Sequence, residues 1–189
     1  MDCRCERPHP APEDDWRHRV SAIADGLFVT GQPRRSDDGP LTEWERLGVE
    51  RVIDVTDEGS PFPRTSSIDR VWLPTPDDGS ARDPGWLADV LAAGEGRVLV
   101  HCHMGVARAP SAAFLLLLDR GWSGLAALEA VMRNRPIAAV SYASDAFRWF
   151  GGSGVDDHEV VALEARRREL LDETRLALLA AHRSTNMGP

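Results

Sequence analysis

The sequence of 189 residues has no lysine, only three cysteines and no long hydrophobic run. All 22 of its basic residues are arginines, which we attribute to codon bias. Three cysteines cannot build the disulfide framework of a small secreted domain, so a reducing compartment fits better. The longest apolar run, residues 112–118, is too short to span a bilayer, and the N-terminus lacks the apolar core of a signal peptide. We therefore expect a cytoplasmic protein.

Basic residues are also fewer than acidic ones: 22 against 30, which gives a formal net charge of -8. This balance disfavours non-specific binding to nucleic acid or to an anionic membrane, so any anion must be held by a local site. Apolar residues make up 42% of the chain and charged residues 28%, which is ordinary for a globular protein. The length favours one folded domain with one active site.

Composition divides the chain into four parts. Residues 1–19 are rich in proline, charge and histidine, which predicts a flexible leader, and residues 20–150 carry the folded domain. The "GGSG" of residues 151–154 is a glycine-rich joint, and residues 155–189 form a C-terminal helix and tail. The helix is expected over residues 156–183, with an apolar stripe that packs either on its own domain or against a second copy of the chain.

Strand and helix patterns alternate along the folded domain. Strands are expected at residues 26–31, 51–57, 69–75 and 97–102, and helices at 41–49, 83–96, 110–121, 123–135 and 144–150. This alternation predicts an α/β fold with one mostly parallel central sheet flanked by helices. Ligands bind at the carboxyl ends of the strands in such sheets, and the segment 101–108 lies at such an edge.

That segment, "HCHMGVARAPS", places a nucleophile and a permanent cation on one short loop between a buried strand and a helix. The amide N–H groups of such a loop can converge on an anion, and the helix dipole adds positive potential. Cys102 would then ionise readily, Gly105 would leave room for the turn, and Arg108 would offer two donors to a phosphate. The spacing indicates a site for a tetrahedral dianion.

The motif resembles the signature loop of the cysteine-dependent protein tyrosine phosphatase superfamily, with His, Cys, five residues and Arg. The stretches "DGLFVTGQP", "LGVERVIDVTD" and "VWLPTPDD" are similar to the dual-specificity branch, especially its small atypical and bacterial members. The resemblance covers about residues 22–150. It implies a protein tyrosine or dual-specificity phosphatase with a phosphocysteine intermediate. We expect neither a metal nor a cofactor, because a single Cys-His run lacks the second pair of ligands that zinc spacing normally shows.

The resemblance also implies roles for individual residues. Cys102 would attack phosphorus, His101 would help to fix the thiolate, and an aspartic acid would protonate the leaving group. Asp77 matches the position of that acid, with Asp78 as the second choice, although "PDDG" is also ordinary turn chemistry. The phosphate-binding loop would comprise His103, Met104, Gly105, Val106, Ala107 and Arg108.

Two alanines depart from the family pattern. Ala109 stands where the branch usually has a serine or threonine whose hydroxyl helps the thiolate to leave, and Ala107 stands where serine is frequent. The departures predict a functional first step and a slow second one. They leave open a phosphate-binding protein without catalysis, and a rhodanese-type sulfurtransferase is a third possibility. Expected partners are phosphorylated proteins or peptides, small phosphomonoesters, and a second copy through the C-terminal helix.

Large residues outside the loop receive ordinary structural interpretations. Trp44, Trp72 and Trp86 fall at helix or strand positions and are expected to pack in the core. Arg133 and Arg135 are expected on a solvated face.

Overall fold

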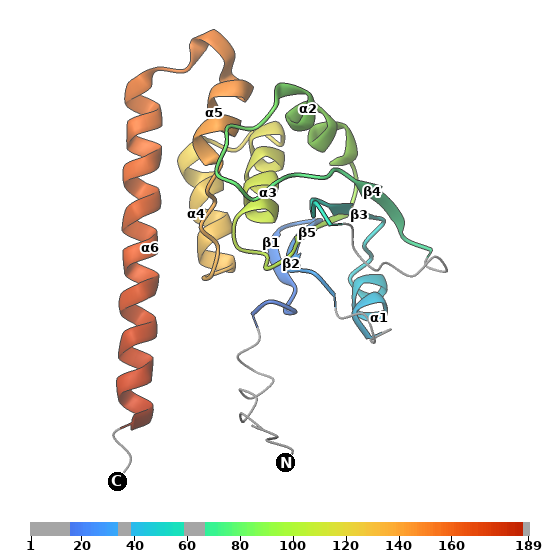
Figure 1. Cartoon of the computed structure of the whole chain (residues 1–189), viewed down its shortest axis with the longest axis horizontal. Coiled ribbons are helices and arrows are strands. Elements are labelled where there is room, and N and C mark those ends of the chain that lie inside the picture. The colour runs from blue at the N-terminus through green and yellow to red at the C-terminus, as the bar shows by residue number, and fades with distance from the viewer. Residues whose placement is uncertain (1–15, 34–38, 59–66, 187–189) are drawn as a thin grey trace, which may run out of the picture.

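The computed structural model describes residues 16–33, 39–58 and 67–186 (Figure 1). Residues 1–15, which make up most of the predicted leader, lie outside the described residues. In chain order the elements are β1 (Ser21–Ala24), β2 (Leu27–Gly31), α1 (Gly39–Arg46), β3 (Arg51–Asp54), β4 (Asp69–Trp72), α2 (Pro84–Ala93), β5 (Val98–Cys102), α3 (Arg108–Asp119), α4 (Gly124–Asn134), α5 (Ala143–Gly151), a 3-10 turn (Gly152–Gly154) and α6 (Asp157–Asn186).

The five strands form one sheet in the order β1-β2-β5-β3-β4. Strands β2, β5, β3 and β4 pair in parallel, and β1 runs antiparallel to β2 at the edge. Every residue of β2 and β5 is buried, as expected for central strands that are covered on both faces. The prediction of a mostly parallel sheet is therefore confirmed, and β1 is a strand that the sequence patterns did not indicate.

Helix α1 covers one face of the sheet (Figure 1). Trp44 of α1 is buried and packs with Phe28, Val52 and Leu99 from three neighbouring strands. The opposite face is covered by α2, α3 and α4, while α5 packs on α3, and the apolar residues of all four helices join the main core. Because side chains alternate along a strand, consecutive residues of β5 point to opposite faces. The side chains of His101 and Cys102 therefore lie on opposite faces of the sheet.

Helix α3 is the centre of the main core. Eleven of its twelve residues, from Arg108 to Leu118, are buried, and it contacts the sheet as well as α2, α4 and α5. Helix α2 begins with Pro84 after Asp83, whose side chain accepts hydrogen bonds from two backbone N–H groups. Helix α4 begins after Ser123, whose hydroxyl accepts from the N–H of Ala126. Asp83 with Pro84, and Ser123, thus mark the starts of these two helices.

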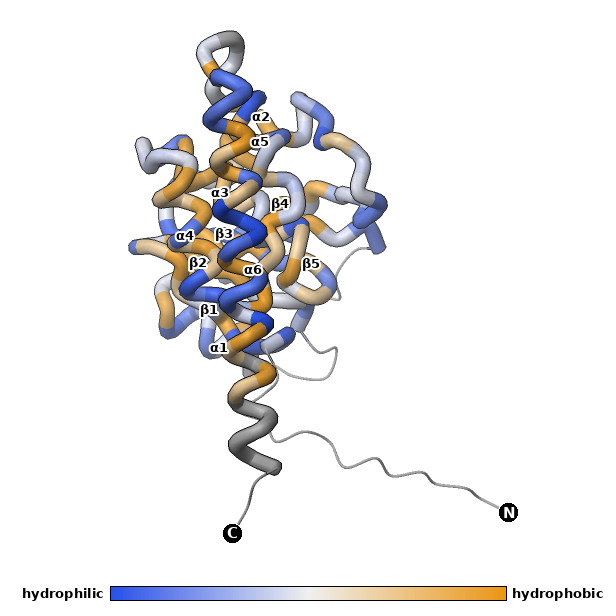
Figure 2. The backbone as a smooth tube through the Cα atoms, turned by 90° about the vertical axis from the view of Figure 1, so that its left-hand side faces the viewer, coloured by the Kyte–Doolittle hydropathy of each residue, from blue (hydrophilic) through white to orange (hydrophobic). Residues whose placement is uncertain are grey.

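Helix α6 packs along α4 and α5. Figure 2, which looks onto α6, shows hydrophilic residues along the middle of the helix. Val160, Leu163 and Leu170 are buried against the domain, which confirms that the helix packs on its own chain over this stretch. Within the described ranges, no helix is long and apolar enough to cross a membrane.

Three sequence expectations about large side chains are tested directly. Trp44 is 1% exposed, as predicted. Trp72 is 50% exposed, so the prediction that it packs in the core was wrong. It ends the edge strand β4, and its indole N–H donates to the Thr56 carbonyl at 2.8 Å. Arg135 was expected in solvent and is fully buried.

Candidate active site

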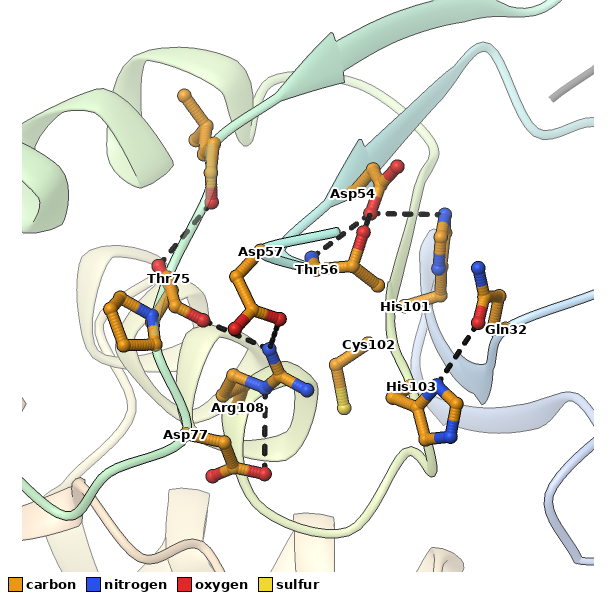
Figure 3. Close-up of polar contacts among 12 residues, drawn as sticks. Gln32, Asp54, Thr56, Asp57, Thr75, Asp77, His101, Cys102, His103 and Arg108 are labelled. Atoms are coloured by element: carbon orange, nitrogen blue, oxygen red, sulfur yellow. Dashed lines mark hydrogen bonds and ion pairs between the residues drawn. The ribbon is translucent and has the colours of Figure 1, made fainter. Parts of the chain in front are cut away.

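The loop between β5 and α3 brings the predicted nucleophile to the carboxyl edge of the sheet. Cys102 is the last residue of β5 and is 2% exposed. The backbone N–H of Gly105 donates to its Sγ at 3.2 Å, so the loop curls back over the sulfur. Figure 3 shows Cys102 with Arg108 on one side and His103 on the other. A main-chain donor aimed at the sulfur stabilises a thiolate more than a thiol.

Gly105 is required at this point for two independent reasons. Its φ is +68°, a left-handed conformation that residues with a side chain rarely adopt. A Cβ there would also lie 2.2 Å from Nη2 of Arg135 and 2.8 Å from the backbone N of Gly31. The glycine therefore allows both the turn and the close approach of β2 and a buried guanidinium.

Arg108 is the first residue of α3, and its guanidinium is held by hydrogen bonds from Nη1. Its Nη1 donates to Oδ1 of Asp57 at 3.0 Å and to the carbonyl of Thr75 at 2.9 Å, while its Nε lies 3.6 Å from Oδ2 of Asp77. Burial opposes its charge, but the hydrogen bond to Asp57 and the negative charges of Cys102 and Asp77 outweigh it and raise the pKa of Arg108. Nε is buried without a hydrogen-bond partner among the described residues. That donor can therefore receive an oxyanion.

The two acid candidates differ in what their carboxylates contact. Asp77 faces the site, where it lies near Arg108 and accepts a hydrogen bond from the Tyr142 hydroxyl at 3.3 Å (Figure 3). Asp78 turns away and accepts from the hydroxyl and N–H of Ser80 and from Arg82. These bonds, led by the Ser80 hydroxyl, lower the pKa of Asp78 to about 2. Asp78 is thus ionised near neutrality and has the turn role that "PDDG" also allowed.

Asp57 is a third carboxylate at the site, which the sequence analysis missed. It follows β3 closely, and β3 pairs in parallel with β5, so the ends of both strands reach the same edge. Hydrogen bonding with Glu58, and next with Arg108, lowers the pKa of Asp57. Asp57 therefore stays ionised and orients Arg108. Its position just after a predicted buried strand was a usable signal.

His101 lies on the other face of the sheet from Cys102. Its ring stacks with Trp44 at a centroid distance of 6.3 Å, and its Nε2 lies 3.7 Å from Oδ1 of Asp54. Burial lowers the pKa of His101 to about 4, with the Asp54 carboxylate opposing and Arg70 reinforcing the shift. The ring is consequently neutral near neutrality and would act on Cys102 through the strand backbone.

The remaining loop residues shape the mouth and base of the site. His103 and Gln32 are joined by two contacts, Nδ1 to Oε1 at 3.1 Å and Gln32 N to the His103 carbonyl at 3.1 Å. Met104 is 46% exposed, and the Val106 carbonyl accepts from Ala139 N at 2.8 Å. Across the described parts of the chain, no three His, Cys, Asp or Glu side chains gather as a metal ion would need.

The two alanines that depart from the signature lie at the start of α3. The Ala107 carbonyl accepts from the Ser111 hydroxyl at 2.8 Å, and Ser111 in turn accepts from Tyr142 N at 3.1 Å. Ala109 is fully buried in the core. The Ser111 hydroxyl is thus committed to the helix backbone and to Tyr142, and Ala109 brings no hydroxyl toward the sulfur.

Comparisons with known proteins give matches in structure only. No protein-family model matches the chain, and no curated protein sequence matches it significantly. The structure is similar to that of a mouse putative dual specificity phosphatase complexed with zinc tungstate, with a TM-score of 0.60 and 21% identity over 78% of this chain and 92% of that chain. Human DUSP28 gives a TM-score of 0.60 and 22% identity over 78% of this chain and 99% of that chain.

A third similar structure is that of a human tyrosine phosphatase-like serine/threonine/tyrosine-interacting protein. Its TM-score is 0.57 at 17% identity, and the match covers 70% of this chain and 96% of that chain. All three matches span nearly the whole of the other chain. The chain therefore has the fold of the dual-specificity branch of the cysteine-dependent protein tyrosine phosphatases.

Proposed function

We propose that the protein is a phosphomonoester hydrolase of the tyrosine or dual-specificity type that works through a phosphocysteine. One observation carries the proposal: the Cys102 sulfur, the Gly105 N–H and the Arg108 guanidinium converge on one loop, with the Asp77 carboxylate 3.6 Å from Arg108 Nε. A nucleophile, an oxyanion site and a proton donor in reach of one another are the parts that such a reaction needs.

In the first step the Cys102 thiolate attacks phosphorus and the bond from phosphorus to the ester oxygen breaks. Asp77 gives its proton to that oxygen, which leaves as an alcohol or phenol. Arg108 and the loop N–H groups hold the three equatorial oxygens as charge builds on them. Asp77 suits this role better than Asp78, which turns away to Ser80 and Arg82, and better than Asp57, which accepts a hydrogen bond from Arg108 Nη1 at 3.0 Å.

In the second step Asp77 takes a proton from water, the hydroxide oxygen bonds to phosphorus, and the sulfur leaves as a thiolate. A hydroxyl next to the sulfur would assist this departure, but position 109 is an alanine. The phosphocysteine should therefore accumulate. Rapid mixing with an aryl phosphate should give a stoichiometric burst followed by slow turnover, and Ala109→Ser should speed the slow phase. A linear time course without a burst would count against a slow second step.

The substrate class follows from the charge of the loop and its surroundings. A single phosphate group matches one arginine and one ring of N–H donors. Because the chain has no lysine, a headgroup with several phosphates would find few additional cations here. We favour phosphotyrosine in proteins or peptides, with phosphoserine, phosphothreonine and small phosphomonoesters as further substrates.

Hydrolysis of an aryl phosphate by four proteins tests the proposal. Wild type should be active and Cys102→Ser inactive. Asp77→Asn should slow the first step, measured as kcat/KM, about 10²- to 10⁴-fold on an alkyl ester, the usual contribution of a general acid, and less on an aryl ester with a good leaving group. Asp78→Asn is the matched control and should stay near wild type. Equal losses in both aspartate variants would remove Asp77 from its role.

A phosphate-binding protein without turnover is the alternative that Ala109 keeps open. Such a protein would hold phosphotyrosine peptides but form no bond to sulfur. Acid quenching after mixing with a radiolabelled phosphopeptide separates the two functions. Label that stays on wild type but not on Cys102→Ser supports catalysis, whereas reversible binding without any covalent label supports the alternative.

A further inference from the structure

Beneath the phosphate-binding loop lies a second arginine that the reaction scheme does not use. Arg135 follows the last residue of α4, and its side chain is fully buried. Arginine is rarely buried unless something pairs with it. Its neighbour Arg133, two residues earlier, has a side chain that is 57% exposed. The burial of Arg135 is therefore specific to its position.

The Arg135 guanidinium binds main-chain carbonyls of the loop directly. Its Nε donates to the Gly105 carbonyl at 2.6 Å, and its Nη2 lies 3.4 Å from the Met104 carbonyl. The Met104 carbonyl shares a peptide unit with the N–H of Gly105. Holding that carbonyl on the side of Arg135 leaves the Gly105 N–H on the side of the sulfur, to which it donates at 3.2 Å.

The other donors of Arg135 fasten the loop to the start of the domain. Nη2 donates to the Trp16 carbonyl at 2.9 Å, and Nη1 donates to the Arg19 carbonyl at 3.0 Å and the Ser21 hydroxyl at 3.2 Å. One side chain thus joins the loop, the edge strand β1 and the residues before it. A shorter or less branched cation could not reach all of these acceptors.

The charge of Arg135 is as notable as its geometry. Its hydrogen bonds go to carbonyls and one hydroxyl, and no carboxylate pairs with it among the described residues. Burial lowers the pKa of Arg135 to about 10, and the negative charge of Cys102 opposes that shift. The guanidinium is therefore charged near neutrality. A buried cation without a carboxylate is costly unless an anion lies close by.

We propose that Arg135 is a positioning residue that holds the phosphate-binding loop in its anion-binding form and lends Cys102 and a bound phosphate a second, buried positive charge. The role rests on the proposed function, since it acts on the same nucleophile. It differs from that of Arg108, which would touch the phosphate oxygens. Arg135 acts indirectly, through its hydrogen bonds to the carbonyls of Gly105 and Met104.

Alkylation of Cys102 by iodoacetamide as a function of pH tests this role without requiring turnover. The full chain would carry Cys3→Ser and Cys5→Ser, so that Cys102 is the only thiol. Arg135→Met removes the charge and the donors, Arg135→Lys keeps the charge with fewer donors, and Arg133→Met is the control on the same helix. Each variant is assayed with and without inorganic phosphate, and folding is checked by thermal unfolding.

In Arg135→Met we expect the pH midpoint of alkylation to rise by about one unit, the lower range for loss of one nearby charge. Protection by inorganic phosphate should weaken about 10-fold, the equivalent of one pKa unit of interaction, because the donors that hold the loop carbonyls are lost together with the charge. Arg135→Lys should keep the midpoint near that of wild type and still lose protection. Arg133→Met should match wild type in both measurements.

A folded Arg135→Met with an unchanged midpoint and unchanged protection would overturn the proposal. If that variant does not fold, Arg135→Lys decides, because unaltered protection there would overturn the positioning role. A failure of the proposed function looks different. In that case wild type would hydrolyse no phosphomonoester. The alkylation midpoints of wild type and Arg135→Met do not depend on turnover, so they would still show whether Arg135 acts on Cys102.

Discussion

Replacing Gly105 by alanine should destabilise the fold far more than its conformation alone requires. A left-handed φ costs an alanine about 1 to 2 kcal/mol. The new Cβ would also lie 2.2 Å from Nη2 of Arg135 and 2.8 Å from the Thr30 carbonyl carbon and the Gly31 nitrogen, so the guanidinium and β2 must move. Weakening the buried hydrogen bonds around the new Cβ adds about 2 to 3 kcal/mol in total. We expect the free energy of unfolding to fall by about 3 to 5 kcal/mol.

Gly121→Ala is the matched control for this prediction. Gly121 has a φ of +83°, and a Cβ built there meets no atom within 4 Å. Both variants bear the conformational cost, so the difference between them isolates the close approach of the loop to Arg135 and β2. Urea unfolding monitored by tryptophan fluorescence measures both. If Gly105→Ala and Gly121→Ala lost the same free energy, the packing of the loop against Arg135 would not be as described here.

Three further predictions address the surroundings of the site. Because the pKa of His101 is lowered to about 4 by burial, the unfolded chain binds the extra proton first, so stability should fall by about 1 to 3 kcal/mol as pH drops from about 6.5 toward 4. His101→Gln should flatten that slope in urea titrations, and an unchanged slope would contradict the burial of a neutral ring. Tyr142→Phe removes the hydroxyl that orients Asp77 and should lower kcat several-fold with little change in KM; a loss confined to KM would argue for substrate contact instead. We also propose that α6 pairs with a second copy through exposed Leu176 and Leu179; changing both to glutamate should halve the mass measured by sedimentation, and a monomeric wild type would remove the proposal.

The sequence predicted the fold well because the signals that define it are local. The strand at Val98–Cys102 is a continuous apolar run, and the helix from Arg108 opens with a proline close to its start. The expected strands at residues 51–57 and 69–75 end earlier, at Asp54 and Trp72. The residues after these strands leave the sheet and run toward Arg108. They are still apolar or β-branched, as Val55 and Thr75 are, so the sequence pattern continues after the strand pairing has ended. The strand β1 was missed because its sequence, Ser21–Ala24, contains a single β-branched residue, Ile23, among alanines and a serine, which are poor strand signals.

Within the site, the sequence placed Cys102, Gly105 and Arg108 on one loop because they are neighbours along the chain. It could not show which residues distant in sequence meet that loop. Asp57 and Tyr142 reach the site from separate elements, and nothing near Arg135 in the sequence distinguishes it from Arg133. One guanidinium is buried and the other exposed only because of how α4 lies against the loop.

The two hydrogen bonds that hold Nη1 of Arg108 reduce the entropy lost when an oxyanion binds. An arginine side chain free in water surrenders about 2 kcal/mol of rotamer entropy when it is immobilised. Here the Asp57 carboxylate and the Thr75 carbonyl hold Nη1 in the folded protein, while Nε has no hydrogen-bond partner among the described residues and lies 3.6 Å from Asp77. An arriving oxyanion then meets a receptor that is already in shape, so little flexibility is lost upon its capture. Oxyanions such as vanadate should accordingly associate quickly, without any slow rearrangement of the loop.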